Sequence, residues 1–415
     1  MSETIYSEYF QIAKDSSQKY GTKTILLMQV GAFLEIYGLT PQLSIPKYKT
    51  QIFDVCQLCE LNVSEKKFQY DGSPIFMAGF RDFASEKYIQ KLVDSGYTVV
   101  VYLQEKNEKN TKRIFHAVYS PGTYLPYESE SSHSLTNNVM CIWIETFVPL
   151  LRKTTNLSSQ TIRNNIVYGV AMSNIYTGQS ALFEHQMPFV MTPTTFDELE
   201  RIVSVHNPSE VIVCSSLEKD ANVQILQYAG VKTSTIHQVS TTHPSAMNCT
   251  KQTYIQHILS TQYGEETYQI CAEFSQYPVA TQAFVYLLHF IKEHNPNLVK
   301  NIFLPVFENT SYRVVLANHT LKQLNIIDDA SNEGKNAGIL SSVSTFLNKC
   351  CSPAGRRRFH STIVNPSFDE EWLTKEYAMI TYMLEPNHYE MIPMFRKQIA
   401  SLCDIEKTAR QLVSR

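Results

Sequence analysis

An uncharged, mostly apolar run from Thr24 to Val30 is followed directly by Gly31 and by a stretch of alternating character. Alternation with a period of two is the pattern of a strand whose two faces meet different surroundings. One face carries Ala32, Leu34 and Ile36, and the other carries Phe33, Glu35 and Tyr37. We therefore expect two consecutive strands that meet near Gly31. The second face is unusual for a core, because it places a carboxylate between two aromatic rings.

The composition sets the scale of the protein. At roughly 150 residues per domain, 415 residues suffice for about two to four domains. Hydrophobic residues make up 43% and charged residues 18%, which is typical of a globular chain and excludes a disordered or fibrous one. The 36 Lys and Arg residues nearly balance the 39 Asp and Glu residues. The chain has no global positive field, so any contact with nucleic acid must come from local patches.

The cysteines and the N-terminus bear on the compartment. Nine cysteines is an odd number, and their spacing is not that of a secreted disulfide scaffold, so we expect a reducing, intracellular compartment. Cytoplasm, nucleus, organelle and viral factory are not distinguished. The first twenty residues lack the apolar core of a signal peptide, and no window reaches about 18 uncharged apolar residues. We expect no membrane partner.

Three domains and a linker are expected along the chain. Residues 1–127 combine helical and strand patterns, which predicts an α/β domain. Residues 128–138 are polar and serine-rich, as in a linker. Strands and helices alternate over 139–250, which predicts a second, mostly parallel α/β domain. Apolar residues recur at helical spacing over 251–415, including one long stretch from Tyr389 to Val413, and predict an α-helical domain.

Phe33 and Glu35 are the residues whose pattern most suggests a function. In one interpretation another helix covers their face, because large aromatic side chains are usually buried. In the other, Phe33 is a wedge that inserts between base steps of DNA and unstacks them. Glu35 would then discriminate, because a carboxylate finds few donors on a normal duplex whereas a displaced base offers an N–H group. The pattern alone leaves both interpretations open.

The segments around these two residues occur in a recognisable order. Ile25 to Tyr37 reads ILLMQVGAFLEIY and resembles the G-D-F-Y-E strand of the MutS family of DNA mismatch-recognition proteins. This places the family's Phe-X-Glu on Phe33 and Glu35. The segments 74–80 (PIFMAGF) and 88–101 (YIQKLVDSGYTVVV) resemble P-x-x-M-A-G-I and Y-x-x-K-L-x-x-x-G-x-x-V-A. Gln104 and 120–123 (SPGT) resemble the end of the same mismatch-binding domain.

The resemblance continues through the rest of the chain. Residues 168–178 (YGVAMSNIYTG) resemble the connector-domain strand, with Asn174 where the family usually has aspartate. Residues 320–325 (TLKQLN) and 338–358 resemble signatures of the helical core. The chain is thus identified as a member of the family, with an α/β mismatch-binding domain over 1–127, an α/β connector over 139–250 and the start of a helical core or lever over 251–415.

The resemblance implies a function and partners. The function is recognition of mispaired or unpaired bases in double-stranded DNA, including small loops, for mismatch repair. Phe33 would stack on the mispaired base and Glu35 would hydrogen-bond to it. The family acts as a dimer and recruits a MutL-like protein when ATP binds, so a homodimer, that partner, ATP and Mg²⁺ are expected of the full-length protein.

Two departures from the family pattern stand out. Ala32 replaces the usual aspartate before the wedge, and residues 80–83 (FRDF) replace I-P-Y-H, which puts the contacts that flank the mismatch in question. The phosphate-binding pattern G-x-x-x-x-G-K-[ST] is absent, so we expect no nucleotide, cofactor or catalytic site in this chain. We expect the family's ATPase domain in a missing C-terminal part, removed or encoded separately.

Weaker candidates complete the site prediction. Lys66, Lys67, Lys112 and Arg113 are possible contacts to the DNA backbone, although a solvated surface is the favoured interpretation for any one of them. Residues 356–358 (RRR) form a basic cluster for which we favour a structural role. Cys56 and Cys59 form a single C-x-x-C pair without a second pair, so we expect ordinary thiols and no metal site.

An alternative function belongs to a different class. A decayed or repurposed MutS-derived scaffold would bind other proteins without reading mismatches. Retention of Phe33 and Glu35 argues against it, whereas Ala32 and the missing ATPase favour it. An enzyme would need a nucleophile or metal cluster, and no such cluster stands out in the sequence.

Overall fold

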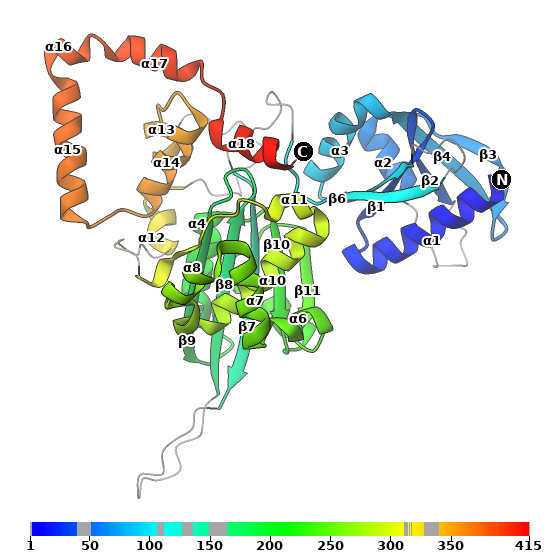
Figure 1. Ribbon diagram of the computed structural model, residues 1–415, viewed down its shortest axis with the longest axis horizontal. Coiled ribbons are helices and arrows are strands. Elements are labelled where there is room, and N and C mark those ends of the chain that lie inside the picture. Colours follow the sequence, from blue (N-terminus) through cyan, green and yellow to red (C-terminus); the bar gives the residue numbers. More distant parts are fainter. Residues whose placement is uncertain are drawn as a thin grey trace, which may run out of the picture. The chain divides into compact units, whose positions relative to one another are not determined.

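The computed structural model describes residues 2–39, 51–105, 112–126, 136–148, 164–310, 314, 316, 318–327 and 340–414 (Figure 1). The chain divides into two compact units. Unit 1 contains Met1–Ser132 together with Ser234–His237 and Phe290–Val299, and unit 2 contains the remaining residues. None of the described helices is both long and apolar enough to cross a membrane.

Unit 1 is built on a six-stranded mixed sheet. Its order is β3-β4-β2-β1-β5-β6, in which only β1 and β5 run parallel among the paired neighbours. The two strands predicted around Gly31 are present and form the β1–β2 hairpin at the centre of the sheet. The strands are β1 (Thr24–Val30), β2 (Phe33–Leu39), β3 (Ser64–Tyr70), β4 (Ser73–Arg81), β5 (Thr98–Gln104) and β6 (Arg113–Tyr119).

Helices cover both faces of this sheet, as Figure 1 shows. On one face, α2 (Ile52–Cys59) and α3 (Ser85–Asp94) pack on a cluster that includes Leu34 and Ile36. On the other face, α1 (Ser2–Tyr20) packs on a cluster that includes Tyr37 and Leu39. Both faces of β2 are therefore core along most of the strand. A short 3₁₀ helix, η1 (Asp82–Ala84), joins β4 to α3.

Unit 2 contains a second six-stranded sheet, of order β11-β10-β7-β8-β9-β12. The prediction of a mostly parallel layer is wrong. Strands β7, β8 and β9 pair antiparallel, whereas β10 joins β7 and β12 joins β9 in parallel, so the sheet is mixed. A tight connection such as that between β8 and β9 permits antiparallel pairing only. The strands are β7 (Asn138–Phe147), β8 (Asn165–Asn174), β9 (Ser180–Pro188), β10 (Glu210–Ser215), β11 (Ile236–Ser240) and β12 (Val306–Phe307).

This sheet also lies between helices. Alternate residues of β7 face α4 (Asp197–His206) and α5 (Lys219–Tyr228), whereas Trp143 faces Tyr286 of α10 (Pro278–His294), with the ring centroids 6.3 Å apart. Helix α10 approaches β8 closely because Gly169 has no side chain, since a Cβ there would lie 2.2 Å from the amide nitrogen of Ala280. That glycine of the 168–178 motif is thus a packing requirement.

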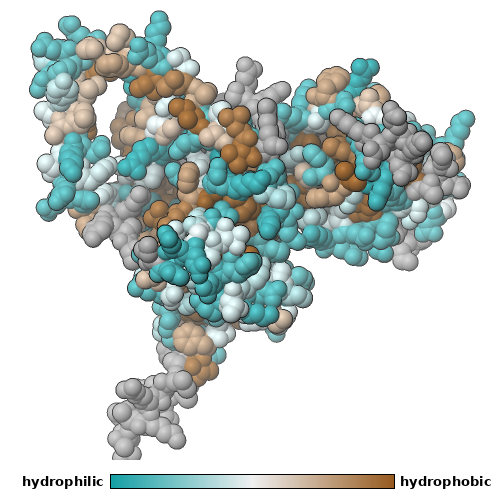
Figure 2. All heavy atoms as spheres, viewed as in Figure 1, coloured by the Kyte–Doolittle hydropathy of each residue, from teal (hydrophilic) through white to brown (hydrophobic). Residues whose placement is uncertain are grey.

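The remaining elements are all helices. They are η2 (Pro193–Phe196), α6 (Pro244–Cys249), α7 (Gln252–Tyr263), α8 (Glu265–Ile270), α9 (Glu273–Gln276), α11 (Pro296–Val299), η3 (Glu308–Thr310), α12 (Asn318–Gln323), α13 (Val343–Leu347), α14 (Pro353–Val364), α15 (Glu370–Leu384), α16 (Pro386–Tyr389), α17 (Ile392–Ala400) and α18 (Ile405–Ser414). The stretch from Tyr389 to Val413 is helical as predicted, but it is divided into the end of α16, α17 and α18. Helices α15, α16 and α17 contain no buried side chain, and Figure 2 shows apolar residues at the surface in this region.

Candidate nucleic-acid interface

Phe33 lies at one end of the unit 1 sheet. It is the first residue of β2, it faces Val30 of β1 and Arg81 of β4 in the register, and 44% of its surface is exposed. Gly31, in the turn just before it, has a φ of +63°, a conformation that glycine adopts without steric cost. The turn thus presents the Phe33 ring to solvent at the end of the sheet that we call the wedge end.

The two interpretations of this face each apply to part of it. Tyr37 and Leu39 are buried beneath α1, as the core interpretation requires. Glu35 is partly buried, and Phe33 extends past the region that the helix covers. Exposure therefore increases along one face of β2 toward the turn, and the ring at the end is available to a ligand.

Glu35 has a defined environment. The hydroxyl of Tyr37 donates a hydrogen bond to Glu35 Oε2. On the neighbouring strand β4, the residue opposite Glu35 is Gly79. A Cβ on Gly79 would lie 2.9 Å from the carbonyl oxygen of Leu34 and 3.3 Å from Glu35 Cγ. The glycine leaves the space in which the stem of the Glu35 side chain lies.

Hydrogen bonds tie the turn before Phe33 to strand β5 and to the 3₁₀ helix η1. The amide of Gly31 donates to Gln104 Oε1 at 3.1 Å, and the amide of Gln104 donates to Gln29 Oε1 at 2.9 Å. The amide of Asp82 donates to the carbonyl oxygen of Ala32 at 3.0 Å. Gln104 matches a family motif, but no pattern in the sequence indicates that its side chain reaches the turn.

Phe83 is an exposed ring that sequence reasoning did not select. It lies in η1 with 80% of its surface exposed, next to the Asp82 amide that bonds to the turn. Asp82 Oδ1 accepts a hydrogen bond from the Phe83 amide at 2.8 Å. Arg81, opposite Phe33 in the register, is also exposed. The departure FRDF in the sequence therefore places an aromatic and a cationic residue at the wedge end.

The predicted lysine contacts are in two places. Lys112 is exposed and immediately precedes β6, where Arg113 faces Gln104 at the wedge end. Lys66 and Lys67 lie on the edge strand β3, from which β2 is separated by β4. Lys67 is exposed and Lys66 partly buried. The structure thus brings Lys112 to the end of the sheet that carries Phe33, and it places the other two at a sheet edge.

Arg113 is corrected from a backbone contact to a structural residue. Only 3% of its side chain is exposed, its Nε donates to the carbonyl oxygen of Gln29 at 3.0 Å, and its Nη1 lies 4.0 Å from Glu8 Oε2. A guanidinium held in this way is not open to a phosphate. Its strand-end position resembled that of a surface cation because the covering residue, Glu8, comes from a distant helix.

The cysteine pair lies inside the core of unit 1. Cys56 and Cys59 are buried in α2. Burial, and secondarily Cys59, raises the pKa of the Cys56 thiol to about 11, whereas a zinc ligand must be a thiolate. Across the described ranges, no three His, Cys, Asp or Glu side chains gather as they would around a metal ion.

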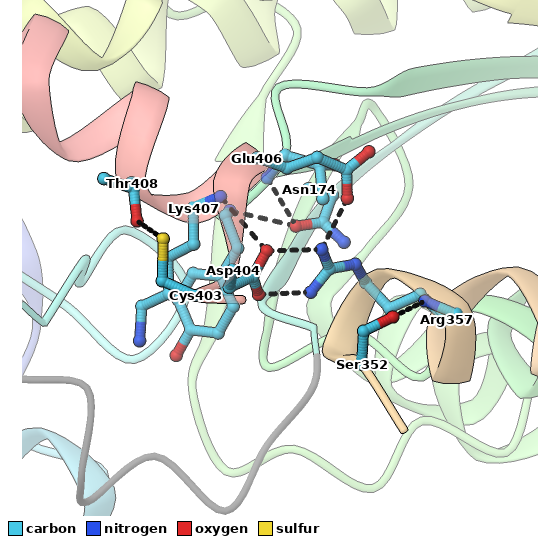
Figure 3. A network of polar contacts seen from close by, with 11 residues as sticks. Asn174, Ser352, Arg357, Cys403, Asp404, Glu406, Lys407 and Thr408 are labelled. Carbon is cyan, nitrogen blue, oxygen red and sulfur yellow. Dashed lines mark hydrogen bonds and ion pairs between the residues drawn. The ribbon is translucent and has the colours of Figure 1, made fainter. Parts of the chain in front are cut away.

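The basic cluster at 356–358 packs within unit 2. Figure 3 shows Arg357 of α14 directed at Asp404, which precedes α18. Its Nη1 and Nη2 donate to the two oxygens of Asp404 at 2.6 and 2.7 Å, and Nη2 also donates to Glu406. A bidentate pair of this kind fixes the orientation of two helices. The structural role predicted for this cluster is confirmed for Arg357.

Asn174 takes the place of the family's aspartate without losing its local role. Its Oδ1 accepts hydrogen bonds from the amides of Tyr176 at 2.9 Å and Thr177 at 3.2 Å. An amide oxygen and a carboxylate oxygen both serve as acceptors in such a turn. The substitution therefore preserves the tight connection between β8 and β9.

Comparisons with known proteins find the same family along the sequence. The family model for MutS domain I matches residues 7–128, which include Phe33 and Glu35. A putative DNA mismatch repair protein mutS homolog from Acanthamoeba polyphaga mimivirus is 25% identical over 99% of this chain and 37% of its own length. A mitochondrial DNA mismatch repair protein mutS homolog from Sarcophyton glaucum is 21% identical over 90% of this chain and 40% of its own length.

A bacterial relative agrees with these two. The DNA mismatch repair protein MutS of Caldanaerobacter subterraneus is 22% identical over 81% of this chain and 34% of its own length. The family model for MutS domain I thus covers the sheet of unit 1. Over most of its length the chain is similar to MutS homologues from a virus, a mitochondrion and a bacterium. It spans about two fifths, or less, of the length of these curated relatives.

Proposed function

We propose that this chain binds double-stranded DNA at mispaired or unpaired bases and serves DNA mismatch repair. Phe33 is the wedge that stacks on the mispaired base, and Glu35 accepts a hydrogen bond from it. The observation that carries the proposal is the pairing of an exposed ring with a carboxylate two residues along the same face, inside a MutS domain I.

The energetics favour weakened base pairs. Inserting a ring between base steps costs a few kcal/mol of stacking. A mismatch or a small loop has already lost part of that stacking, so the same insertion costs less there. Glu35 adds to the difference, because its negative charge is repelled by the phosphates and gains a partner only where a base offers an N–H group. Selectivity arises from both terms together.

The hydrogen bonds that hold the turn before Phe33 suit the insertion of its ring between bases. Both the amide of Gly31 and the carbonyl oxygen of Ala32 are hydrogen-bonded to residues outside the hairpin, at 3.1 and 3.0 Å. A side chain held by a fixed backbone loses less conformational freedom on binding than one on a mobile loop. Arg81 and Lys112, exposed at the same end of the sheet, supply positive charge for the flanking phosphates.

Other functions of MutS proteins involve residues other than Phe33 and Glu35. We assign ATP and Mg²⁺ binding, homodimer formation and contact with a MutL-like protein to the full-length protein. The proposed division of this chain is a mismatch-binding domain over 1–127, a linker over 128–138, a connector over 139–250 and part of the helical core over 251–415. Residues 128–135 of the linker lie outside the described residues. We place the protein in an intracellular, reducing compartment.

Binding of the 415-residue chain to three duplexes tests the proposal. One duplex is fully matched, one contains a G·T mismatch and one contains an unpaired T, each at two salt concentrations. We expect the wild type to prefer the two defective duplexes and Phe33→Ala to lose that preference, because the substitution removes the wedge. Phe53→Ala is the matched control, since Phe53 is 42% exposed but lies on α2.

Two results would contradict the proposal. Equal, steeply salt-dependent binding of all three duplexes, unchanged by Phe33→Ala, would show that only phosphate contact remains. The scaffold function would then be the better account, with the exposed apolar side chains of α15 to α17 as its interaction surface. A loss of preference in Phe53→Ala equal to that in Phe33→Ala would show that the effect is not specific to the wedge.

A further inference from the structure

We propose that Tyr37 is a positioning residue for mismatch recognition, whose hydroxyl holds the Glu35 carboxylate in the orientation that reads the base. The inference rests on the proposed function, because it assigns a task to a neighbour of the reading residue. It concerns a side chain that is itself buried beneath α1 and does not reach DNA.

The ring of Tyr37 is held in place by two other tyrosines. It meets Tyr6 edge to face at 5.1 Å and Tyr9 edge to face at 4.9 Å between centroids. Tyr9 is fixed in turn, because its hydroxyl donates to the carbonyl oxygen of Leu26 at 2.9 Å. Edge-to-face contacts of this kind define ring orientation as well as adding packing energy. The hydroxyl of Tyr37 therefore occupies one position relative to β2.

That hydroxyl remains a donor at neutral pH. Burial, then the hydrogen bond to Glu35 and its charge, raise the pKa of Tyr37 well above the ordinary value for tyrosine. The influence of the carboxylate extends to the next ring, since burial and then the charge of Glu35 raise the pKa of Tyr6. A protonated phenol beside a carboxylate can only donate to it. The direction of the hydrogen bond is thus fixed by the surroundings.

The hydrogen bond from Tyr37 gives the two carboxylate oxygens of Glu35 different partners. Oε2 accepts from Tyr37, so we assign Oε1 to the donor of the displaced base. Gly79 gives room to the stem of the side chain, and Met28, opposite Glu35 on β1, is fully buried. Glutamate otherwise has several rotamers of similar energy, and fixing one of them before DNA arrives removes an entropic cost from binding.

The substitution Tyr37→Phe isolates the hydroxyl, because it retains the ring and its contacts with Tyr6 and Tyr9. We expect the ratio of mismatched to matched affinity to fall about 3- to 10-fold, the range for ordering one flexible side chain. Affinity for matched DNA should not change. The measurement is the binding of the 415-residue chain to G·T and matched duplexes at fixed salt, with circular dichroism as the check on folding.

Tyr9→Phe is the matched control. It removes a hydroxyl from the same ring cluster, but one that bonds to the Leu26 carbonyl oxygen instead of Glu35. We expect the discrimination ratio to stay at the wild-type value, even where thermal stability falls. A loss of discrimination equal to that of Tyr37→Phe would overturn the proposal, since packing of the cluster would then explain both variants.

A double-mutant cycle with Glu35→Ala separates positioning from packing. If Tyr37 acts through Glu35, Tyr37→Phe has no further effect on discrimination in the Glu35→Ala background. An equal loss in both backgrounds would overturn the proposal. Unchanged discrimination in Tyr37→Phe, while Phe33→Ala abolishes it, would overturn the positioning role and leave the mismatch function standing. Absence of any mismatch preference in the wild type would overturn both.

Discussion

At the residue scale, Phe83 shows how one substitution in a family motif changes a surface. Its ring is 80% exposed and lies in η1, beside the turn that carries the wedge. It lies on neither face of β2, so it has no direct path to Glu35. If the wedge end meets DNA as proposed, a ring in this position gains contact area on the duplex whether or not the bases are paired.

Phe83→Ala should therefore weaken binding without changing selectivity. We expect a loss of about 1 kcal/mol, roughly fivefold in affinity, on matched and mismatched duplexes alike, from the apolar area that the ring buries. The measurement is titration of both duplexes with the variant and with Phe53→Ala as the control. A variant that lost only its affinity for mismatched DNA would show that Phe83 reads the defect itself.

The residues of the site differ in how far the sequence predicts them. Phe33 and Glu35 were found because alternation along β2 is local, and because a family motif falls on them. Tyr37 belongs to the predicted strand pattern, but its hydrogen bond to Glu35 is not predictable from that pattern. A strand pattern does not say where α1 will lie. Arg113 was misassigned for the same reason: the atoms that bury it come from β1 and α1, far away in the sequence.

At the element scale, prediction succeeds where the period of apolar residues is strong and the ends are marked. The strand predicted from Thr24 to Val30 has those bounds in the structure. Prediction fails where the structure depends on pairing between strands that are far apart in the sequence. Strand direction in unit 2 depends on which strands become neighbours, and periodicity within one strand carries no information about that.

The contact between α14 and the start of α18 should depend on acid pH. Burial alone would raise the pKa of Asp404, but the hydrogen bonds and charge of Arg357 outweigh burial, and the pKa lies below its ordinary value. A carboxyl group with a lowered folded pKa contributes fully above its unfolded pKa of about 3.9 and loses that contribution as pH falls through the folded value. Stabilisation of α18 is therefore present at neutral pH and lost below about pH 4.

Hydrogen exchange of the α18 amides between pH 5 and pH 3 measures this effect. The wild type should lose protection on acidification, after correction for the intrinsic exchange rate. Asp404→Asn should already have reduced protection at pH 5 and a shallower dependence. The buried Arg410 of α18, whose pKa burial lowers to about 10, stays charged throughout this window and donates to the carbonyl oxygens of Ile175 and Lys300, so its contribution does not change with pH. Identical profiles in the two proteins would show that Asp404 does not control the helix.

At the scale of the whole molecule, stability is distributed unevenly. Helix α10 is buried on most of its surface, including Ala280, Phe284 and Leu287. Helices α15 and α17 bury no side chain, and they expose residues such as Tyr377, Met379 and Met394. Helices of 15 and 9 residues without tertiary packing are marginal in water.

Amides of α15 and α17 should therefore exchange with solvent orders of magnitude faster than those of α10. Hydrogen exchange followed by mass spectrometry on the intact chain makes the comparison within one molecule. The control is the same experiment at two protein concentrations, because self-association would cover the exposed apolar residues. Protection of α15 equal to that of α10 at the lower concentration would contradict the expectation.

The hydrogen bonds from Gly31 to Gln104 of β5 and from Asp82 of η1 to Ala32 have a mechanical consequence. Separating two stacked base pairs requires energy. If the turn that carries Phe33 deforms under that load, part of the energy is spent on deforming the protein. If the turn were more compliant than the stacked bases, the ring would tilt and the duplex would stay closed. Gln104 and Asp82 anchor the turn on either side and so limit how far it can bend. If Phe33 is the proposed wedge, the base pairs then separate before the turn deforms, and they separate most readily where stacking is weakest.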